Sequence, residues 1–61
     1  MEKYAKIGDM DKQGRAMFKR ERDGKTCLVK VSWFKIDPAG SGSFIPRSRT
    51  KALHMAMLDW E

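Results

Sequence analysis

The sequence predicts a small α+β domain in which an antiparallel β-sheet of two to three strands packs on one C-terminal α-helix. Three observations predict this class. Asp23-Gly24 separates two segments of alternating apolar and polar residues, residues 44–46 are typical of a short strand, and apolar residues recur at helical spacing after residue 50. A chain of 61 residues has room for one domain.

The first fourteen residues sustain no hydrophobic period, and they carry Tyr4 and Ile7 among charged side chains. We therefore expect residues 1–14 to form an N-terminal arm, partly disordered, ahead of a single ββ(β)α domain over residues 15–61. An ordered strand in the arm would require Tyr4 or Ile7 to reach the core.

A β-hairpin is expected around Asp23-Gly24, because a type I′ turn needs positive φ at both central positions and this dipeptide favours it. A two-residue turn there pairs Phe18 with Val29. Side-chain alternation then gives the hairpin two different faces. The face predicted to join the core carries Ala16, Phe18, Cys27, Val29, Val31 and Trp33. The outer face is basic with apolar residues between, and carries Arg15, Met17, Lys19, Glu21, Thr26, Leu28, Lys30, Ser32 and Phe34.

The remaining elements follow in order. Phe44-Ile45-Pro46 predicts a short third strand that ends at Pro46, which lacks a backbone N–H. Ser48 or Thr50 can cap a helix that begins just afterwards. An apolar stripe is predicted to face the sheet and leaves Met55 and Leu58 outside it; its members are Ala52, Leu53, Ala56, Met57 and Trp60.

Charge is distributed unevenly along the chain. The net charge is +5, and the first 36 residues hold ten Lys/Arg against five acids. Such a positive surface suits nucleic acid, an acidic protein or an anionic membrane. The alternative is a charged face that only keeps a small protein in solution.

The composition argues against several classes. Cys27 is the only cysteine and His54 the only histidine, so neither a disulfide nor a structural zinc site can form within the chain. Gly40-Ser41-Gly42-Ser43 is not followed by the Lys-Ser/Thr of a phosphate-binding loop. We expect no enzyme, no cofactor and no metal. No apolar stretch approaches about 20 residues and the N-terminus lacks a signal peptide, so we expect a cytoplasmic protein without a membrane partner.

Nucleic-acid binding, with DNA as the expected ligand, is the function that the basic residues favour. The outer face of the hairpin would make the contact, and a second basic cluster lies where the third strand meets the helix. The expected contact residues are Arg15, Lys19, Arg22, Lys25, Lys30, Arg47, Arg49 and Lys51.

This order of elements carries a basic hairpin over Lys19 to Lys25, a strand over Cys27 to Lys35 and a helix start at Arg49-Thr50-Lys51-Ala52-Leu53. It resembles the arm-type DNA-binding domains at the N-terminus of phage and transposon integrases, which are similar to plant AP2 domains. The resemblance runs from about Gly14 to Trp60. It implies a phage or mobile-element protein whose sheet reads DNA on the face away from the helix. The short third strand and the glycine-rich loop before it depart from that pattern.

Two alternatives belong to other classes. A protein-interaction or inhibitor module, with an acidic protein among its partners, would use exposed apolar anchors. Its expected contact residues are Met17, Leu28, Phe34, Met55 and Leu58. A small structural protein that self-associates, for example as a homodimer, would use the helix or an exposed strand edge.

Overall fold

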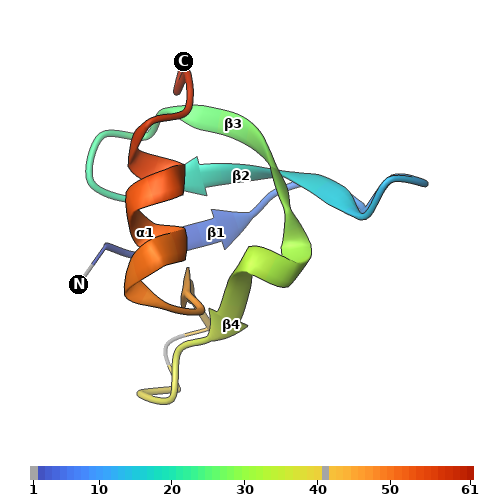
Figure 1. The fold of residues 1–61 in the computed structure, drawn as a ribbon. Helices are drawn as coiled ribbons and strands as arrows, with labels where there is room; N and C mark the ends of the chain where they lie inside the picture. The colour runs from blue at the N-terminus through green and yellow to red at the C-terminus, as the bar shows by residue number, and fades with distance from the viewer. Residues whose placement is uncertain (1, 41) are drawn as a thin grey trace.

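The structure, a computed structural model, describes residues 2–40 and 42–61 and is of the α+β class. Five strands and one helix make up the fold (Figure 1). A turn of 3-10 helix, η1, interrupts the strands. The elements in chain order are β1 (Tyr4–Lys6), β2 (Arg15–Arg20), β3 (Thr26–Lys30), η1 (Val31–Trp33), β4 (Phe34–Ile36), β5 (Phe44–Pro46) and α1 (Arg49–Ala56).

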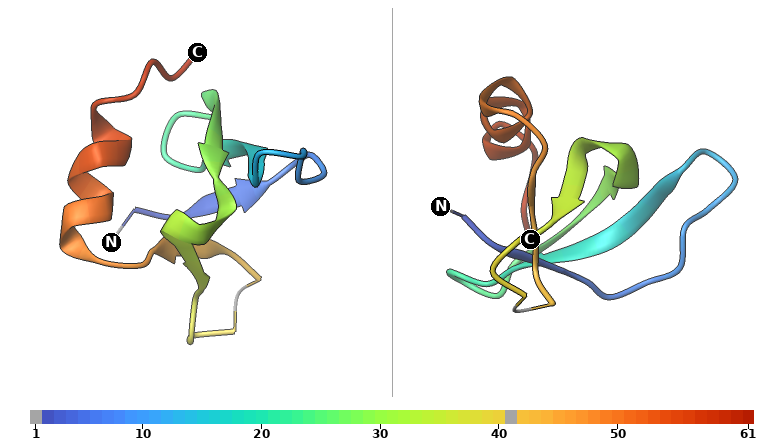
Figure 2. Two further views of the ribbon diagram at one scale, coloured as in Figure 1. Left: turned by 45° about the vertical axis from the view of Figure 1, so that its right-hand side comes forward. Right: turned by 90° about the horizontal axis from the view of Figure 1, so that it is seen from below.

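All strand pairs are antiparallel, in the order β3-β2-β1-β5-β4. The two outermost strands, β3 and β4, follow one another in the chain and are joined by η1 alone. The sheet therefore curls until its two ends meet at η1, and α1 lies across the open side of the curl (Figure 2).

The sheet is larger than the two to three strands that the sequence predicts. Tyr4–Lys6, expected within an arm, forms the central strand β1 between β2 and β5. Tyr4 is buried there against Phe34 and Trp60. Three residues are too few to show a period of two, so the strand leaves no clear signal in the sequence.

The predicted hairpin exists, but its register differs from the prediction. Phe18 pairs with Cys27 instead of Val29. Among the described residues only glycines have positive φ, so Asp23 cannot occupy a type I′ position, and Gly24 alone adopts φ 72°. The loop is longer as a result, with the Gly24 N–H donating to the Arg20 carbonyl at 2.7 Å. The register moves by two residues, which leaves the side chains of the paired residues 15–19 and 26–30 on their predicted faces.

The face prediction fails after Lys30, where η1 changes the phase of the alternation. Phe34, predicted on the outer face, is 2% exposed and stacks on Phe18 with ring centroids 3.9 Å apart. Val31 and Trp33, predicted in the core, are only half-buried. A single 3-10 turn rotates the chain in a way that strict alternation cannot anticipate.

The helix begins where the sequence predicts but buries another face. The Ser48 hydroxyl accepts a hydrogen bond from the Lys51 N–H at 3.2 Å, which confirms Ser48 as N-cap. Met55, predicted outside the stripe, is completely buried, whereas Leu53 and Met57 are exposed. The prediction was wrong because α1 ends at Ala56, so Trp60 does not share its periodicity.

Trp60 reaches the core from the segment after the helix. Its indole N–H donates to the Met55 carbonyl at 2.6 Å, and its ring stacks on Tyr4. The next residue, Glu61, exchanges two backbone hydrogen bonds with Thr26 at the start of β3. The core between sheet and helix is therefore mainly aromatic, and it consists of Tyr4, Ala16, Phe18, Val29, Phe34, Met55 and Trp60.

Neither α1 nor any other helical segment in residues 2–40 and 42–61 has the length and apolar character that crossing a bilayer requires.

Candidate nucleic-acid interface

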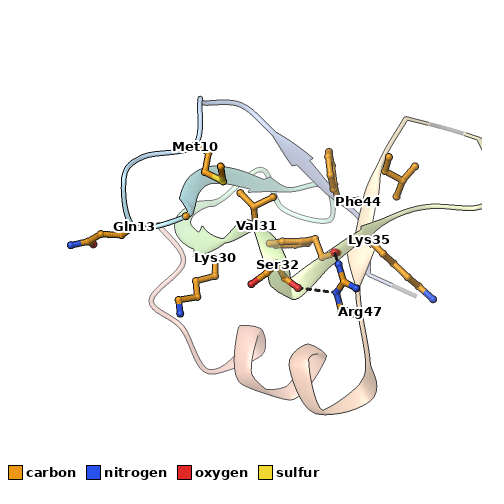
Figure 3. A pocket seen from close by; sticks show the side chains of 11 residues that line it. Met10, Gln13, Lys30, Val31, Ser32, Lys35, Phe44 and Arg47 are labelled. Atoms are coloured by element: carbon orange, nitrogen blue, oxygen red, sulfur yellow. Dashed lines mark hydrogen bonds between the residues drawn. The ribbon is translucent and has the colours of Figure 1, made fainter.

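An open groove of about 620 Å³ lies between η1, the β4–β5 pair and the loop that joins β1 to β2 (Figure 3). Its interior is apolar, with Val31 and Phe44 on opposite sides and Met10 reaching over from the loop. Cations lie at both ends, Lys30 at one and Lys35 with Arg47 at the other. The remaining lining residues are Gln13, Gly14, Ser32, Phe34 and Ile36.

Arg47 is held in place by backbone groups. Its Nε donates to the Ser32 carbonyl at 2.9 Å, and one terminal nitrogen donates to the Phe34 carbonyl at 3.3 Å. Neutral carbonyls fix the guanidinium without cancelling its charge. The Arg47 side chain therefore presents a positioned cation with donors left over for an incoming anion.

Two smaller depressions adjoin this groove. One, of about 370 Å³, shares Lys35 and Arg47 with it and adds Arg49. The other, of about 230 Å³, shares Lys30 and adds Arg15. We call the three together the cationic groove; its cations are Arg15, Lys30, Lys35, Arg47 and Arg49.

No Asp or Glu of the described chain is among the residues that line the cationic groove. Several acids instead pair with cations elsewhere. Asp23 accepts from Arg20 at 2.7 Å, and Glu2 accepts from Arg22 at 3.1 Å. The Arg20 hydrogen bond lowers the pKa of Asp23 to about 2. The separation of charge leaves the groove uniformly positive.

The eight predicted nucleic-acid contacts divide into three groups: four line the groove, one lies beside it and three lie outside it. Arg15, Lys30, Arg47 and Arg49 line the cationic groove. Lys51 lies beside it, with its ammonium 4.9 Å from the centre of the Trp33 ring, which lines the smallest depression. The others do not line it: Lys19 on the outer face of β2, and Arg22 and Lys25 at the β2–β3 loop.

Arg15 is the most enclosed of the groove cations. A terminal nitrogen donates to the Gln13 side-chain oxygen, while the buried Nε has no hydrogen-bond acceptor among the described residues. An unpaired charged donor is costly, so an anion that drew the guanidinium outward would relieve it.

The predicted protein-interaction residues do not form one surface. Met17 and Leu28 pair across the hairpin and are exposed on its outer face. Phe34 and Met55 are buried in the core, and Leu58 is half-buried against it. Phe34 and Met55 therefore cannot serve as exposed anchors in this fold, because their apolar surface is already used in packing, whereas Leu58 still lines the smallest depression.

Sequence reasoning missed much of the groove interior. Lys35 is among the ten Lys/Arg of the first 36 residues but not among the predicted contacts, and neither Met10 nor Phe44 is a predicted site residue. Met10 lies in a loop without periodicity, so no local pattern marks it. Lys35 carries a signal that the sequence does show: it lies between Phe34 and Ile36 in an apolar–basic–apolar alternation typical of a strand.

The one histidine and the one cysteine of the chain, His54 and Cys27, lie on different elements. His54 is exposed on α1, 5.9 Å from the Trp33 ring centre. Cys27 is half-buried in β3, and burial raises the pKa of its thiol. No cluster of three or more His, Cys, Asp or Glu suited to a metal occurs in the described part of the chain.

No protein-family model, curated protein or solved structure matches this chain.

Proposed function

We propose that this protein binds nucleic acid through the cationic groove. One observation carries the proposal: five cations line three adjoining depressions to which no carboxylate of the described residues contributes. A nucleic-acid backbone places negative charges at regular short intervals, and most protein contacts to it come from such Lys and Arg side chains.

The groove suits this ligand better than the outer face of the hairpin does. Of the cations around that face, Arg22 already pairs with Glu2. Arg15 and Lys30 of that face line the groove itself, so only Lys19 and Lys25 remain outside it, beside the exposed Met17 and Leu28. A positioned guanidinium such as Arg47 loses less conformational entropy on binding than a mobile lysine.

Two charge-matched double variants test the location. Lys35→Ala/Arg49→Ala removes two exposed groove cations, and Lys19→Ala/Lys25→Ala removes two exposed cations outside it. Each lowers the net charge from +5 to +3. We expect the groove variant to bind a labelled oligonucleotide roughly 10- to 30-fold more weakly near 0.1 M salt, and the control to change about threefold or less. Fluorescence anisotropy measures both.

Equal losses in the two variants would mean that only net charge matters, and a larger loss in Lys19→Ala/Lys25→Ala would move the interface to the hairpin. Absence of binding by the wild-type chain would reject the proposed function. Circular dichroism of each variant verifies that the fold is retained.

A protein contact is the second candidate function, and the outer face of the sheet supports it. The Ile7 N–H, just after β1, donates to the Met17 carbonyl at 2.9 Å, and Met17 on β2 pairs with Leu28 on β3, so three exposed apolar side chains lie in neighbouring segments. Exposed apolar patches often mark protein contacts. Self-association through this patch would raise the mass in solution above 7.1 kDa as concentration increases, which a dilution series on size exclusion measures.

A further inference from the structure

We infer that the nucleic acid bound by the cationic groove is single-stranded, with bases entering the apolar interior and phosphates on the cations at its ends. This inference rests on the proposed function and deepens it.

The apolar interior is the first support. Between Lys30 at one end and Arg47 at the other, the largest depression is lined by Val31, Phe44 and Met10 (Figure 3). Charged phosphates make no favourable contact with such an apolar surface, whereas the flat faces of bases can pack on it. Proteins that bind single strands without sequence preference combine a positive groove with apolar and aromatic side chains on which bases stack.

The concave shape is the second support. A duplex is a convex cylinder with phosphates outside and bases stacked inside, and its base edges are read by an element that protrudes into a groove. Here the cations surround a recess. A duplex laid across them would leave Phe44 and Val31 facing empty space, while a single strand can turn its bases inward.

The size of the site is the third support. Sites of about 300–1,000 Å³ enclose ligands of drug size, so the depression of about 620 Å³ has room for a base with its sugar. This depression shares Lys30 with the smallest one and Lys35 and Arg47 with the third. The three recesses are therefore neighbours that share cations, so a strand of several nucleotides that leaves one recess meets a cation of the next.

Three ligands of equal length, about 12 nucleotides, test the inference; small single-strand-binding domains cover about 4–16 nucleotides. They are an oligodeoxythymidine, an abasic strand with the same phosphodiester backbone, and a duplex. At about 50 mM salt we expect the thymidine strand to bind roughly tenfold more tightly than the abasic strand, because the bases contribute. We expect it also to bind more tightly than the duplex. An oligouridylate of the same length compares RNA with DNA, and tight binding of either single strand supports the inference.

A pair of variants with matched side chains locates the bases. Ile36 lines the groove and is 69% exposed, while Leu53 is 62% exposed on α1 and does not line it. We expect Ile36→Ala to weaken thymidine binding about threefold or more while leaving abasic binding unchanged. Leu53→Ala should change neither. Both side chains are largely exposed, so neither substitution should unfold the domain.

The outcomes separate the inference from the proposed function. Equal or tighter binding of the duplex, or equal binding of the thymidine and abasic strands, overturns the single-strand inference and leaves nucleic-acid binding in place. Equal effects of Ile36→Ala and Leu53→Ala overturn the placement of bases in the groove. Failure of all ligands to bind rejects the proposed function itself.

Discussion

Asp23 does more at the β2–β3 loop than form a turn. Its carboxylate accepts two hydrogen bonds from Arg20, at 3.1 and 2.7 Å, and one from the Lys25 N–H at 3.1 Å. The Arg20 guanidinium carbon lies 5.0 Å from the centre of the Trp60 ring. Asp23 thus neutralises a largely buried cation that packs on the C-terminal aromatic residue, and it links the loop to the core.

Protonation of Asp23 should destabilise the fold at low pH. Its pKa is lowered from 3.8 to about 2, chiefly by the Arg20 hydrogen bond. A carboxyl with a lowered folded-state pKa stabilises the protein above its ordinary pKa, and this contribution is lost as pH falls toward the folded-state value. We expect Asp23→Asn to lower the urea midpoint at pH 7, with the gap to wild type closing between pH 3.8 and about 2.

The exposed carboxylate of Asp59 provides the control. Asp59→Asn removes the same charge outside this pair, so we expect its urea midpoint at pH 7 to stay close to that of wild type. A gap for Asp23→Asn that stays constant from pH 7 to 2 would show that the ion pair does not contribute as described.

At the scale of elements, α1 is an eight-residue helix whose buried face is fixed by one side chain, Met55. Met57, two residues on, is 83% exposed. Eight residues are too few for a stable isolated helix, so tertiary packing has to hold α1 on the sheet. The segment after it contributes as well, since Trp60 donates to the Met55 carbonyl.

Two methionine substitutions measure which face of α1 packs. Met55→Ala creates a cavity in the core and should lower the free energy of unfolding by about 2–5 kcal/mol. Met57→Ala removes the same atoms from solvent and should change it by about 0.5 kcal/mol or less. Urea denaturation followed by tryptophan fluorescence measures both. Similar losses in the two variants would show that the helix is rotated or that α1 does not pack as described.

The elements also show what the sequence can predict about the fold. The hairpin faces, the third strand, the Ser48 cap and the helix start all follow from local pattern, and the structure has them. Strand β1 has no local signal, because its strand conformation comes from pairing with β2 and β5. The predictions for Phe34 and Met55 were wrong for related reasons. Phe34 follows the 3-10 turn η1, and Met55 lies next to the end of α1 at Ala56, and a strict period ignores both changes of backbone geometry. Tertiary contacts decide such positions.

The same limit applies to the candidate site. The eight predicted contacts belong to the hairpin and to the junction of the third strand with the helix, and four of them line the cationic groove. They line three neighbouring depressions, and the largest of these brings Lys30 at the end of β3 together with Arg47 after β5. Arg15 on β2 lines a depression that shares Lys30 with it. Sequence spacing cannot show this, because Lys30 and Arg47 are 17 positions apart.

At the scale of the whole molecule, the ion pairs of the described residues lie outside the cationic groove. Ion pairs join Lys3 to Asp37 at 3.3 Å, Arg22 to Glu2 and Arg20 to Asp23. Most of the field outside the protein should therefore originate at the cationic groove. Such a field accelerates the encounter with a polyanion and makes binding sensitive to salt.

The salt dependence of the binding affinity reports how many cations contact phosphate. Affinity for a single strand falls with a log–log slope of about −0.7 per neutralised phosphate, so five groove cations predict a slope near −3.5 and roughly a 100-fold loss from 50 to 200 mM salt. Lys35→Ala/Arg49→Ala leaves three of them, which predicts a slope near −2 and a loss of roughly 20-fold. Lys19→Ala/Lys25→Ala should keep the wild-type slope. These two lysines lie outside the groove, and a cation that does not contact phosphate releases no counterion from the ligand. Anisotropy titrations at several salt concentrations measure the three slopes. Identical slopes in both double variants would mean that the cations of the groove do not act as the phosphate contacts.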